Sequence, residues 1–518
     1  MRNIVNIINF IRSGDPRAPE RDFVLPVKKQ LELLNRYAFT GTFLLEYDAL
    51  ILPVYQELLR GTRHEIGAWF EPVQALAEKA GLIWRSKRGY SWDWYANVGT
   101  LCGYTPRERE QLIDAYMDTF CEIFGHLPKS VGAWVWDAHS LRYLKDKYAI
   151  KAACICKEQY GTDGYTLWGG YYNGGYYPSC NNALSPAPNG ENQISLPVFR
   201  MLGIDPVEQY DYGMDLSNGG ADWQGVITLE PSCNGVGGAD PKWVDRYFRE
   251  NFGRDNGTYS YTQVGQENAM GWESMRDGLD YQFRRLSDLK NEYGLHIETL
   301  SQTGEWFASA YPITPQCVCF CDSDSSGSGK KSFWYNCSRY RVNFFFDENG
   351  FRIRDLYVFS STQEERYLVA PCKTESLAYY TLPIIDGNRY SGNGIRAGLY
   401  FRDSSAGKNI HCENITYTPS DLQAMLTADT KKFGKVTIVC YPSGEISINV
   451  EKNFADLLLC FCYDDSRIDC LRERKDGKTV IYRFCGTNYG LSLIGGVFSE
   501  QGDEIRFCEK EIKITVTQ

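Results

Sequence analysis

The stretch VGAWVWDAHSLRYLKDKYAIKAACIC, residues 131–156, holds the repeating unit that decides the fold of this chain. Its two ends, Val131–Trp136 and Lys151–Cys156, are apolar runs of the length of a buried strand. Leu141–Tyr148, between them, has the pattern of a helix. A strand, a helix and a second strand in this order predict a parallel strand pair joined by a crossover helix.

Strands and helices alternate in this way from the start of the chain to about residue 310. Repeated strand–helix units predict a parallel sheet, and we expect it to close into a (β/α)7-8 barrel rather than stay open. The candidate strands slightly exceed the eight of a full barrel, so one or two are expected to be insertion hairpins. They are Ile4–Phe10, Thr40–Glu46, Glu65–Phe70, Val131–Trp136, Lys151–Cys156, Leu196–Met201, Val226–Leu229, Ser260–Val264 and Ile297–Ser301, and the main helices are Pro26–Tyr37, Arg107–Phe124, Leu141–Tyr148, Pro241–Phe252 and Leu279–Tyr293.

The pattern changes after Pro312. Asp322–Lys331 is a polar stretch typical of a flexible loop, and short alternating strands follow it, separated by turn signals such as Asn349-Gly350. We therefore expect two domains, a catalytic β/α barrel over residues 1–312 and an all-β, β-sandwich accessory domain over residues 313–518. The second domain could trim the active site, bind carbohydrate or mediate a homodimer, and the sequence does not choose among these roles.

The length of 518 residues suits two or three cores, and the apolar and charged fractions of 43% and 23% are typical of globular proteins. The formal net charge is −10 and there is no basic stripe, which argues against nucleic acid or an anionic membrane as a partner. Asn residues interrupt the apolar residues of Met1–Phe10, and no window reaches the ~18 apolar residues of a membrane span. A cytoplasmic protein is expected.

Eighteen cysteines need an explanation, and many of them alternate along strands, as Cys154 and Cys156 do. Neighbours on the same strand face diverge too far to form a disulfide, and there is no C-x-x-C pair of the kind that binds metal. We expect reduced, buried thiols. Aromatic residues make up 14% of the chain, which suits sugar-binding clefts but also all-β cores.

Reactive groups of a β/α barrel lie just past the carboxyl ends of its strands. The residues at these positions form an acid-rich set, which suits glycosidic bond cleavage because that reaction needs one group to protonate the leaving oxygen and another to activate water or attack. The alternative for each acid is a loop cap or a solvated surface charge. The set comprises Asp15, Glu46, Asp48, Glu71, Asp137, Glu158, Asp205, Glu230, Glu267 and Glu305.

His139 and Asp15 are the main catalytic candidates. His139 is one of only five histidines and follows an apolar strand, and its imidazole titrates near neutral pH; a histidine that caps a helix or packs in the core explains it equally well. Asp15 lies between Arg12 and Arg17, which favour its ionised form, although an aspartate before a proline is also a common turn residue.

Two further features point to substrate contacts. Arg200 emerges from an apolar run, so it needs an anionic partner, which is either a substrate carboxylate or an internal acid such as Asp205. The Gly- and Tyr-rich stretch Trp168–Pro178 offers flat aromatic faces on a bendable backbone. It could line a sugar subsite or form a non-catalytic surface flap.

Residues 38–72 and 106–150 resemble the polysaccharide-deacetylase (NodB-like) superfamily of β/α barrels. The resemblance rests on Thr-Gly-Thr-Phe-Leu-Leu at 40–45, His-Glu-Ile-Gly at 64–67, the helix start at 105–110 and Trp-Asp-Ala-His-Ser-Leu at 136–141. In that superfamily a metal-binding H-x-x-x-H pair usually follows the His-Glu-Ile-Gly segment. Ala68–Val73 stands there in this chain, so the resemblance implies a metal-free hydrolase on that scaffold, with no metal or other cofactor.

Within this superfamily the chain looks most like glycoside hydrolase family 156, the inverting exo-sialidases. That resemblance implies acid/base work shared by Asp15 and His139, with Arg200 holding the substrate carboxylate. We therefore expect an inverting exo-sialidase that releases terminal sialic acid from glycoconjugates. A carbohydrate deacetylase, another glycosidase and a non-catalytic carbohydrate-binding protein remain alternatives. The further subsite candidates are Glu46, Asp48, Trp136, Asn268 and Gln302.

Overall fold

A parallel sheet forms the N-terminal part of the computed structural model, which describes residues 1–156, 174–208, 214, 216, 227–232 and 235–518. Its strand order is β10-β1-β2-β3-β4-β5-β9-β6, and β11 pairs with β1 as well. Every pair is parallel except that of β6 with β9. The strands are β1 (Arg2–Ile11), β2 (Thr42–Leu45), β3 (Glu65–Trp69), β4 (Ser130–Ala133), β5 (Ala152–Ile155), β6 (Gly175–Tyr176), β9 (Val198–Arg200), β10 (Tyr259–Val264) and β11 (Leu295–Glu298).

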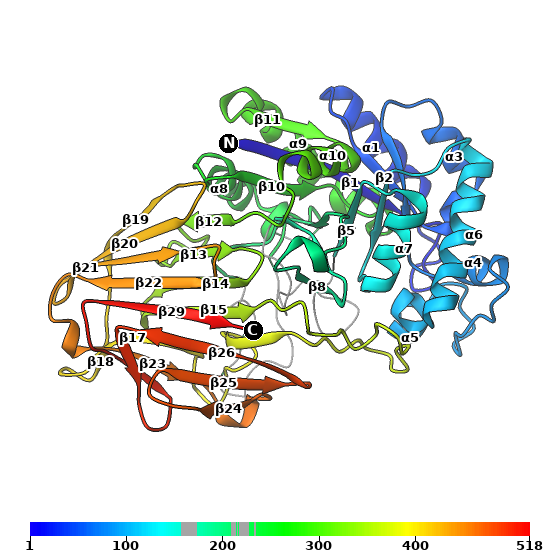
Figure 1. The fold of residues 1–518 in the computed structure, drawn as a ribbon. Coiled ribbons are helices and arrows are strands. Elements are labelled where there is room, and N and C mark those ends of the chain that lie inside the picture. The colour runs from blue at the N-terminus through cyan, green and yellow to red at the C-terminus, as the bar shows by residue number, and fades with distance from the viewer. Residues whose placement is uncertain (157–173, 209–213, 215, 217–226, 233–234) are drawn as a thin grey trace.

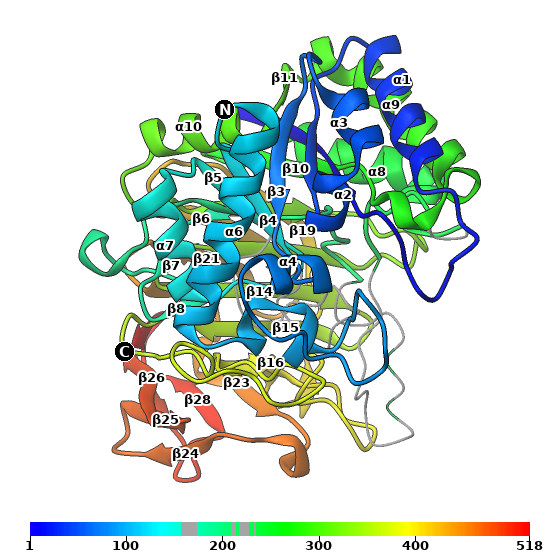
Figure 2. The same cartoon turned by 90° about the vertical axis from the view of Figure 1, so that its right-hand side faces the viewer.

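The sheet is nearly closed and barrel-like, with the long strand β1 at its centre. The first half of β1 pairs with β11 and its second half with β2, while β10 runs along it from Arg2 to Ile7. Between β9 and β10 the backbone N–H of Gly203 donates to the carbonyl of Gln263 at 3.4 Å. The helices surround this sheet (Figure 2) and are α1 (Val24–Arg36), α2 (Tyr47–Ile51), α3 (Pro53–Leu59), α4 (Gln74–Lys79), α5 (Ala96–Gly99), α6 (Pro106–Phe124), α7 (Ala138–Tyr148), α8 (Pro241–Phe252), α9 (Trp272–Glu292) and α10 (Leu300–Ala310).

Helix α10 covers the amino ends of the strands. The N–H of Leu300 donates to Thr42 Oγ1 at 3.0 Å, and the N–H of Ser301 donates to Glu65 Oε2 at 3.1 Å. Thr42 and Glu65 are the first residues of β2 and β3. Helix α10 therefore packs across the amino ends of β2 and β3, and the carboxyl ends of the strands lie at the opposite edge of the sheet.

Two of the expected strands differ from those observed. The candidate Ile297–Ser301 is wrong in its second half, because Thr299 caps α10 in a reciprocal capping box with Gln302 and the strand ends at Glu298. Of the candidate Val226–Leu229, residue 226 lies outside the described residues, and Thr228 forms only an isolated antiparallel bridge with Ile204. The predicted helices are present, several of them longer at the amino end than expected.

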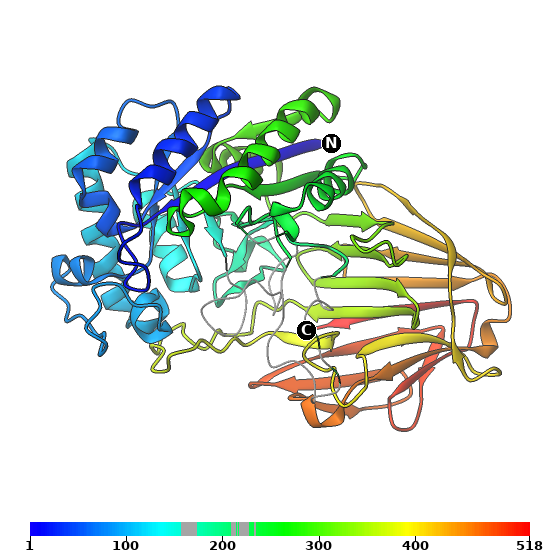
Figure 3. The same ribbon diagram turned by 180° about the vertical axis from the view of Figure 1, so that it is seen from behind.

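Residues 317–518 form two further sheets that share one apolar core (Figure 3). Phe344, Ile353 and Leu399 of one sheet pack in the same cluster as Ile438 and Ile448 of the other. The first sheet holds β12 (Cys317–Cys321), β13 (Lys331–Asn336), β14 (Tyr340–Asp347), β15 (Gly350–Val358), β16 (Leu382–Asp386), β17 (Gly398–Asp403), β18 (Lys408–Asn409), β23 (Leu457–Cys462), β27 (Gly496–Phe498) and β28 (Glu504–Phe507). The second holds β19 (Glu413–Thr418), β20 (Ala424–Thr430), β21 (Gly434–Cys440), β22 (Glu445–Val450), β24 (Leu471–Arg474), β25 (Thr479–Phe484), β26 (Thr487–Ile494) and β29 (Glu511–Thr517), and a small hairpin of β7 (Pro178–Ser179) and β8 (Asn182–Pro186) lies apart from both.

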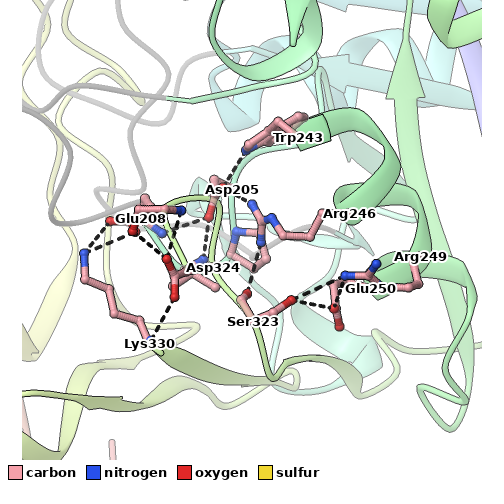
Figure 4. Close-up of polar contacts among 12 residues, drawn as sticks. Asp205, Glu208, Trp243, Arg246, Arg249, Glu250, Ser323, Asp324 and Lys330 are labelled. Carbon is pink, nitrogen blue, oxygen red and sulfur yellow. Dashed lines mark hydrogen bonds and ion pairs between the residues drawn. The ribbon is translucent and has the colours of Figure 1, made fainter. Parts of the chain in front are cut away.

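Buried polar contacts join this β-rich region to the barrel (Figure 4). Asp205 accepts a hydrogen bond from Trp243 Nε1 at 2.6 Å and pairs with Arg246, both from α8. Arg246 Nη1 in turn donates to the carbonyl of Ser323, which follows β12, at 3.3 Å. Because Asp205 is fully buried, its charge has to be matched inside the protein, and α8 provides the partner.

The polar loop 322–331 folds around Asp324. Its carboxylate accepts hydrogen bonds from the backbone N–H groups of Ser326, Ser328, Gly329 and Lys330, which, against the effect of burial, lower the pKa of Asp324 to about 2. The Lys330 ammonium also pairs with Glu208 at 2.9 Å (Figure 4). These contacts place the loop against the barrel.

The cysteines in the described part of the chain are free thiols, most of them buried. Burial raises the pKa of Cys154 well above its usual range, and that of Cys317 to about 12. These groups are therefore protonated near neutral pH and pack as small apolar side chains. Among the described helices, none is long and apolar enough to span a membrane.

Candidate functional site

A cavity of about 320 Å³ opens at the carboxyl ends of the strands. Arg12 follows β1, Glu71 follows β3, Trp134 follows β4 and Glu267 follows β10, and all four side chains line the cavity. Parallel strands bring their carboxyl ends to one edge of a sheet, so residues far apart in sequence meet here. The barrel therefore places its candidate functional site where that fold usually has it.

A buried guanidinium joins two of the cavity's carboxylates. Arg12 Nη2 lies 3.5 Å from Glu71 Oε2 and 3.2 Å from Glu267 Oε2, and the three side chains are at most 10% exposed. Arg12 Nε and Nη1 donate to no residue in the described part of the chain, although Nη1 lies 3.7 Å from Asp15. The guanidinium thus keeps hydrogen-bonding capacity for a ligand in the cavity.

The two carboxylates differ in their surroundings. Burial raises the pKa of Glu267, the nearby charges of Glu71 and Glu230 raise it further, and Arg12 opposes the rise. Glu71 Oε2 instead accepts a hydrogen bond from Trp69 Nε1 at 3.2 Å. A carboxyl with a raised pKa beside a second, hydrogen-bonded carboxyl group has the arrangement of a general acid with its partner.

Glu46 follows β2 and lies buried beside this group. Burial raises the pKa of Glu46 well above 4.5, Glu71 adds to the rise, and Arg12 opposes it. Glu46 does not line the cavity. Glu46 therefore places a buried carboxyl group with a raised pKa next to Arg12 and Glu71.

Replacing Glu46 with glutamine is expected to reduce the dependence of stability on pH. The folded protein keeps a proton on Glu46 that the unfolded chain releases above about pH 4.5, so the free energy of unfolding falls as pH rises from there toward the pKa of the folded state. Melting temperatures of the wild type and Glu46→Gln between about pH 5 and pH 8 test this. The exposed Glu57→Gln is the control, and parallel curves for wild type and Glu46→Gln would contradict the expectation.

Tryptophans form much of the cavity wall. Trp92, Trp94 and Trp134 all line it, and the buried Trp92 Nε1 has no hydrogen-bond partner within the described residues. The Arg12 guanidinium lies over the Trp92 ring at 4.4 Å, and that of Arg17 lies over the Trp94 ring at 4.9 Å. Flat rings with one free N–H donor suit a sugar, which offers a C–H face and hydroxyl groups.

Asp15 lies at the edge of this site but does not line the cavity. Its carboxylate receives hydrogen bonds from Arg17 Nε and Nη2 at 3.0 and 2.7 Å. Burial would raise the pKa of Asp15, but the contacts with Arg17 outweigh it and lower the pKa. In this geometry Asp15 holds Arg17, which does line the cavity.

The structure does not bring His139 to the cavity. Only Trp134 and Val135 of the loop after β4 line it, and Asp137 then caps α7. His139 is the second residue of α7, and its Nε2 lies 3.0 Å from Glu110 Oε1 of α6. The expected pairing of Asp15 and His139 across one pocket is therefore absent, because the first turn of α7 directs the imidazole toward the neighbouring helix.

Two predicted subsite residues, Asn268 and Trp136, lie outside the cavity and have structural contacts instead. Asn268 Nδ2 donates to the carbonyls of Arg12 and Phe23 at 2.8 Å, and its Oδ1 accepts from the N–H of Arg12 at 3.0 Å. Trp136 is buried and donates to the carbonyl of Cys154 at 2.8 Å. Neither lines the cavity, so Asn268 positions the backbone of Arg12 and Trp136 packs in the core.

The remaining candidates lie elsewhere in the barrel. Arg200 is buried at the end of β9 and Asp48 lies in α2, where burial raises its pKa to about 6. Gln302 belongs to the capping box of α10, at the amino ends of the strands. None of the three lines the cavity. Of the Gly- and Tyr-rich stretch, residues 168–173 lie outside the described residues.

Three of the glutamates that follow predicted strands, Glu71, Glu230 and Glu267, do line the cavity. Arg12, Trp92 and Trp94 were not predicted as site residues. The dense aromatic run 90–95, Tyr-Ser-Trp-Asp-Trp-Tyr, was the available signal for the two tryptophans. Arg12 had no such signal, since a single arginine after a strand is common.

A divalent metal of the kind found in polysaccharide deacetylases does not fit these residues. No group of three or more His, Cys, Asp or Glu in the described residues could hold a metal ion. Glu71 and Glu267 already share the positive charge of the Arg12 guanidinium.

No protein-family model matches the sequence, and no curated protein matches it either. Among solved structures, the fold is similar to that of a protein from Parabacteroides distasonis provisionally named a glycoside hydrolase/deacetylase. That match has 15% identity and a TM-score of 0.52, and covers 74% of this chain and 89% of the other. A polysaccharide deacetylase from Mycobacterium smegmatis, also provisionally named, matches with 13% identity, a TM-score of 0.36 and coverage of 59% and 90%.

A peptidoglycan deacetylase from Bacillus subtilis matches more weakly, with 12% identity, a TM-score of 0.28 and coverage of 60% and 93%. At these identities the first likeness concerns the fold alone. The fold of this chain is thus similar to that of the Parabacteroides distasonis protein.

Proposed function

We propose that this protein is a glycoside hydrolase that works through carboxylates. The observation that carries the proposal is the position of Glu71 and Glu267, which line one cavity and contact the same nitrogen of Arg12. Glycosidic bond cleavage needs such a pair, one group protonated and one ionised. The raised pKa of Glu267 identifies it as the acid.

In the proposed mechanism Glu267 gives its proton to the leaving oxygen as the bond to the anomeric carbon breaks. Glu71 stabilises the positive charge that develops at the anomeric carbon and bonds to it, and water then releases the sugar with Glu267 acting as base. Arg12 contacts both acids and orients them. Trp69 fixes one oxygen of Glu71 through its N–H.

The shared contact with Arg12 bears on stereochemistry. The two Oε2 atoms can be no farther apart than the sum of their distances to Nη2, 3.5 and 3.2 Å, and the sum is reached only if the three atoms are collinear. Carboxyl groups of retaining enzymes are about 5–5.5 Å apart and those of inverting enzymes about 6.5–9.5 Å. The bound applies to one pair of oxygens and favours the shorter separation, so retention of the anomeric configuration is proposed in place of the inversion expected from the family resemblance.

The charges of the cavity favour a neutral sugar. With Glu267 protonated as the acid, Glu71 and Glu230 balance the two arginines that line the cavity, and Arg17 is already held by Asp15. An exo-sialidase stays a narrower proposal within the same class, since a sialic acid carboxylate would have to draw on Arg12 or Arg17. A carbohydrate deacetylase is the second candidate, favoured by the fold shared with a glycoside hydrolase/deacetylase.

A panel of chromogenic glycosides tests the proposal. We expect release of chromophore from a hexosyl or N-acetylhexosaminyl substrate, a retained product anomer by NMR, and no loss of activity after treatment with a metal chelator. Hydrolysis of the sialyl substrate instead would support the sialidase and contradict the neutral-sugar preference. Acetate release without glycoside cleavage would favour the deacetylase, and sugar binding without turnover would indicate a non-catalytic protein.

A further inference from the structure

The segment between β15 and β16, residues 359–381, leaves the β-rich region and packs on the barrel. Figure 1 shows it extending toward α5, and we call it the strap. Leu382 and Ile384 directly after it belong to the core of the β-rich region. The buried side chains of the strap instead join the apolar cluster of the barrel; they are Phe359, Tyr367, Cys372, Leu377 and Tyr379.

The first half of the strap is anchored by Glu365. Its buried carboxylate accepts hydrogen bonds from the N–H of Ala138, the first residue of α7, at 2.7 Å and from the N–H of Ala183 at 2.8 Å. Burial and the nearby charge of Asp137 raise the pKa of Glu365 to about 8, against the effect of these two N–H donors and of Arg109. Arg109 of α6 adds a hydrogen bond from Nη2 to the carbonyl of Tyr367 at 2.7 Å.

The second half of the strap holds the aromatic wall of the cavity. The N–H of Cys372 donates to the carbonyl of Cys102 at 2.7 Å, and the N–H of Ala96 donates to the carbonyl of Glu375 at 2.8 Å. Both partners lie in residues 92–104, the segment that supplies Trp92 and Trp94 to the cavity. The strap thus fixes this wall through backbone bonds that do not depend on side-chain identity.

Leu377 of the strap itself lines the cavity. Resting on the proposed function, we infer that the strap makes the β-rich region part of the substrate site and that Leu377 determines which sugar substituents are accepted. An apolar side chain at the wall leaves a space of fixed size beside the tryptophans. A larger side chain excludes the substrate, and a smaller one admits bulkier substituents.

Leu377→Trp and Leu377→Ala test the role of this side chain, with Leu422→Ala as the matched control because Leu422 is 79% exposed in the same region. For the best glycoside of the wild type, Leu377→Trp is expected to lower kcat/KM about tenfold or more, mainly through KM. The N-acetylhexosaminyl glycoside is the bulkier of the two substrate types. In Leu377→Ala, its kcat/KM is expected to rise about tenfold relative to that of the hexosyl glycoside. Changes of equal size for all substrates would overturn the assignment.

Ala96→Pro tests the anchoring of the wall. Ala96 is the first residue of α5, where proline is tolerated, and Tyr95 before it is extended, as a residue before proline should be. The change removes the N–H that reaches Glu375 and adds ring atoms at a buried position, so a circular dichroism spectrum first checks that the variant is folded. Hydrogen exchange in residues 92–104 is expected to become about tenfold faster, with unfolding elsewhere unchanged. Unchanged exchange would overturn the anchoring role.

The two proposals fail in different ways. If the wild type cleaves no glycoside, the proposed hydrolase activity fails, and binding of the same sugars, followed by tryptophan fluorescence, then replaces kinetics for the Leu377 variants. If the wild type turns over or binds sugars but the Leu377 variants show the same selectivity, the inference about the strap is wrong and the proposed function stands. Absence of both turnover and binding in the wild type overturns both proposals.

Discussion

Replacing Glu267 with glutamine is expected to lower kcat by about 10²- to 10⁴-fold, the usual contribution of a general acid. Glutamine keeps the size of the side chain but has no proton to give to the leaving oxygen. Glu267 is half of the pair that Arg12 contacts at 3.5 and 3.2 Å, and burial raises its pKa, so it is the member of this pair suited to the role of the acid. Steady-state kinetics on the best glycoside measure the effect.

The pH profile carries a second signature of this acid. Because the reaction needs Glu267 protonated and burial raises its pKa, the activity of the wild type should persist to a higher pH than the ordinary glutamate pKa would allow, and then fall. In Glu267→Gln this alkaline fall should vanish from the residual activity. Glu273→Gln, an exposed change on α9, should match the wild type. A Glu267→Gln enzyme with full activity would refute the assignment of the acid.

Replacing Arg109 with alanine is expected to destabilise the protein by about 3–5 kcal/mol, the usual effect of breaking a buried ion pair. Arg109 is fully buried, and its Nη1 donates to Asp137 at 2.8 Å. Its Nε donates to the carbonyls of Leu101 and Tyr104 at 3.0 and 2.8 Å, and its Nη2 reaches the strap at Tyr367. Its loss leaves the buried Asp137 charge and several carbonyls without this partner.

Denaturant unfolding followed by fluorescence and circular dichroism measures this loss. Since the chain has more than one core, the midpoint of the transition that reports on the barrel is the quantity to compare. Arg276→Ala on the outer face of α9 is the control, because its side chain is 50% exposed and its ion pairs are screened by water. If Arg109→Ala is as stable as Arg276→Ala, the buried ion pair makes no net contribution to the free energy of unfolding.

The cavity brings together side chains that lie far apart in the sequence. Glu71 and Glu267 could be proposed from their positions after predicted strands, because a parallel barrel collects strand ends at one edge. The same rule proposed Asp48 and Asp137, which the structure places in α2 and at the cap of α7. A position after a strand therefore limits the candidates without selecting among them.

Local signals account for what the sequence alone determined. Alternating apolar runs defined the parallel barrel and the β-rich region after it, and the capping box of Thr105 with Glu108 defined the start of α6, because these features depend on residues a few positions apart. The site depended on contacts between distant residues. Only the tertiary structure showed that Arg12 joins Glu71 and Glu267, that α7 turns His139 toward Glu110, and that Leu377 reaches the cavity from the β-rich region, since each follows from how separate elements pack.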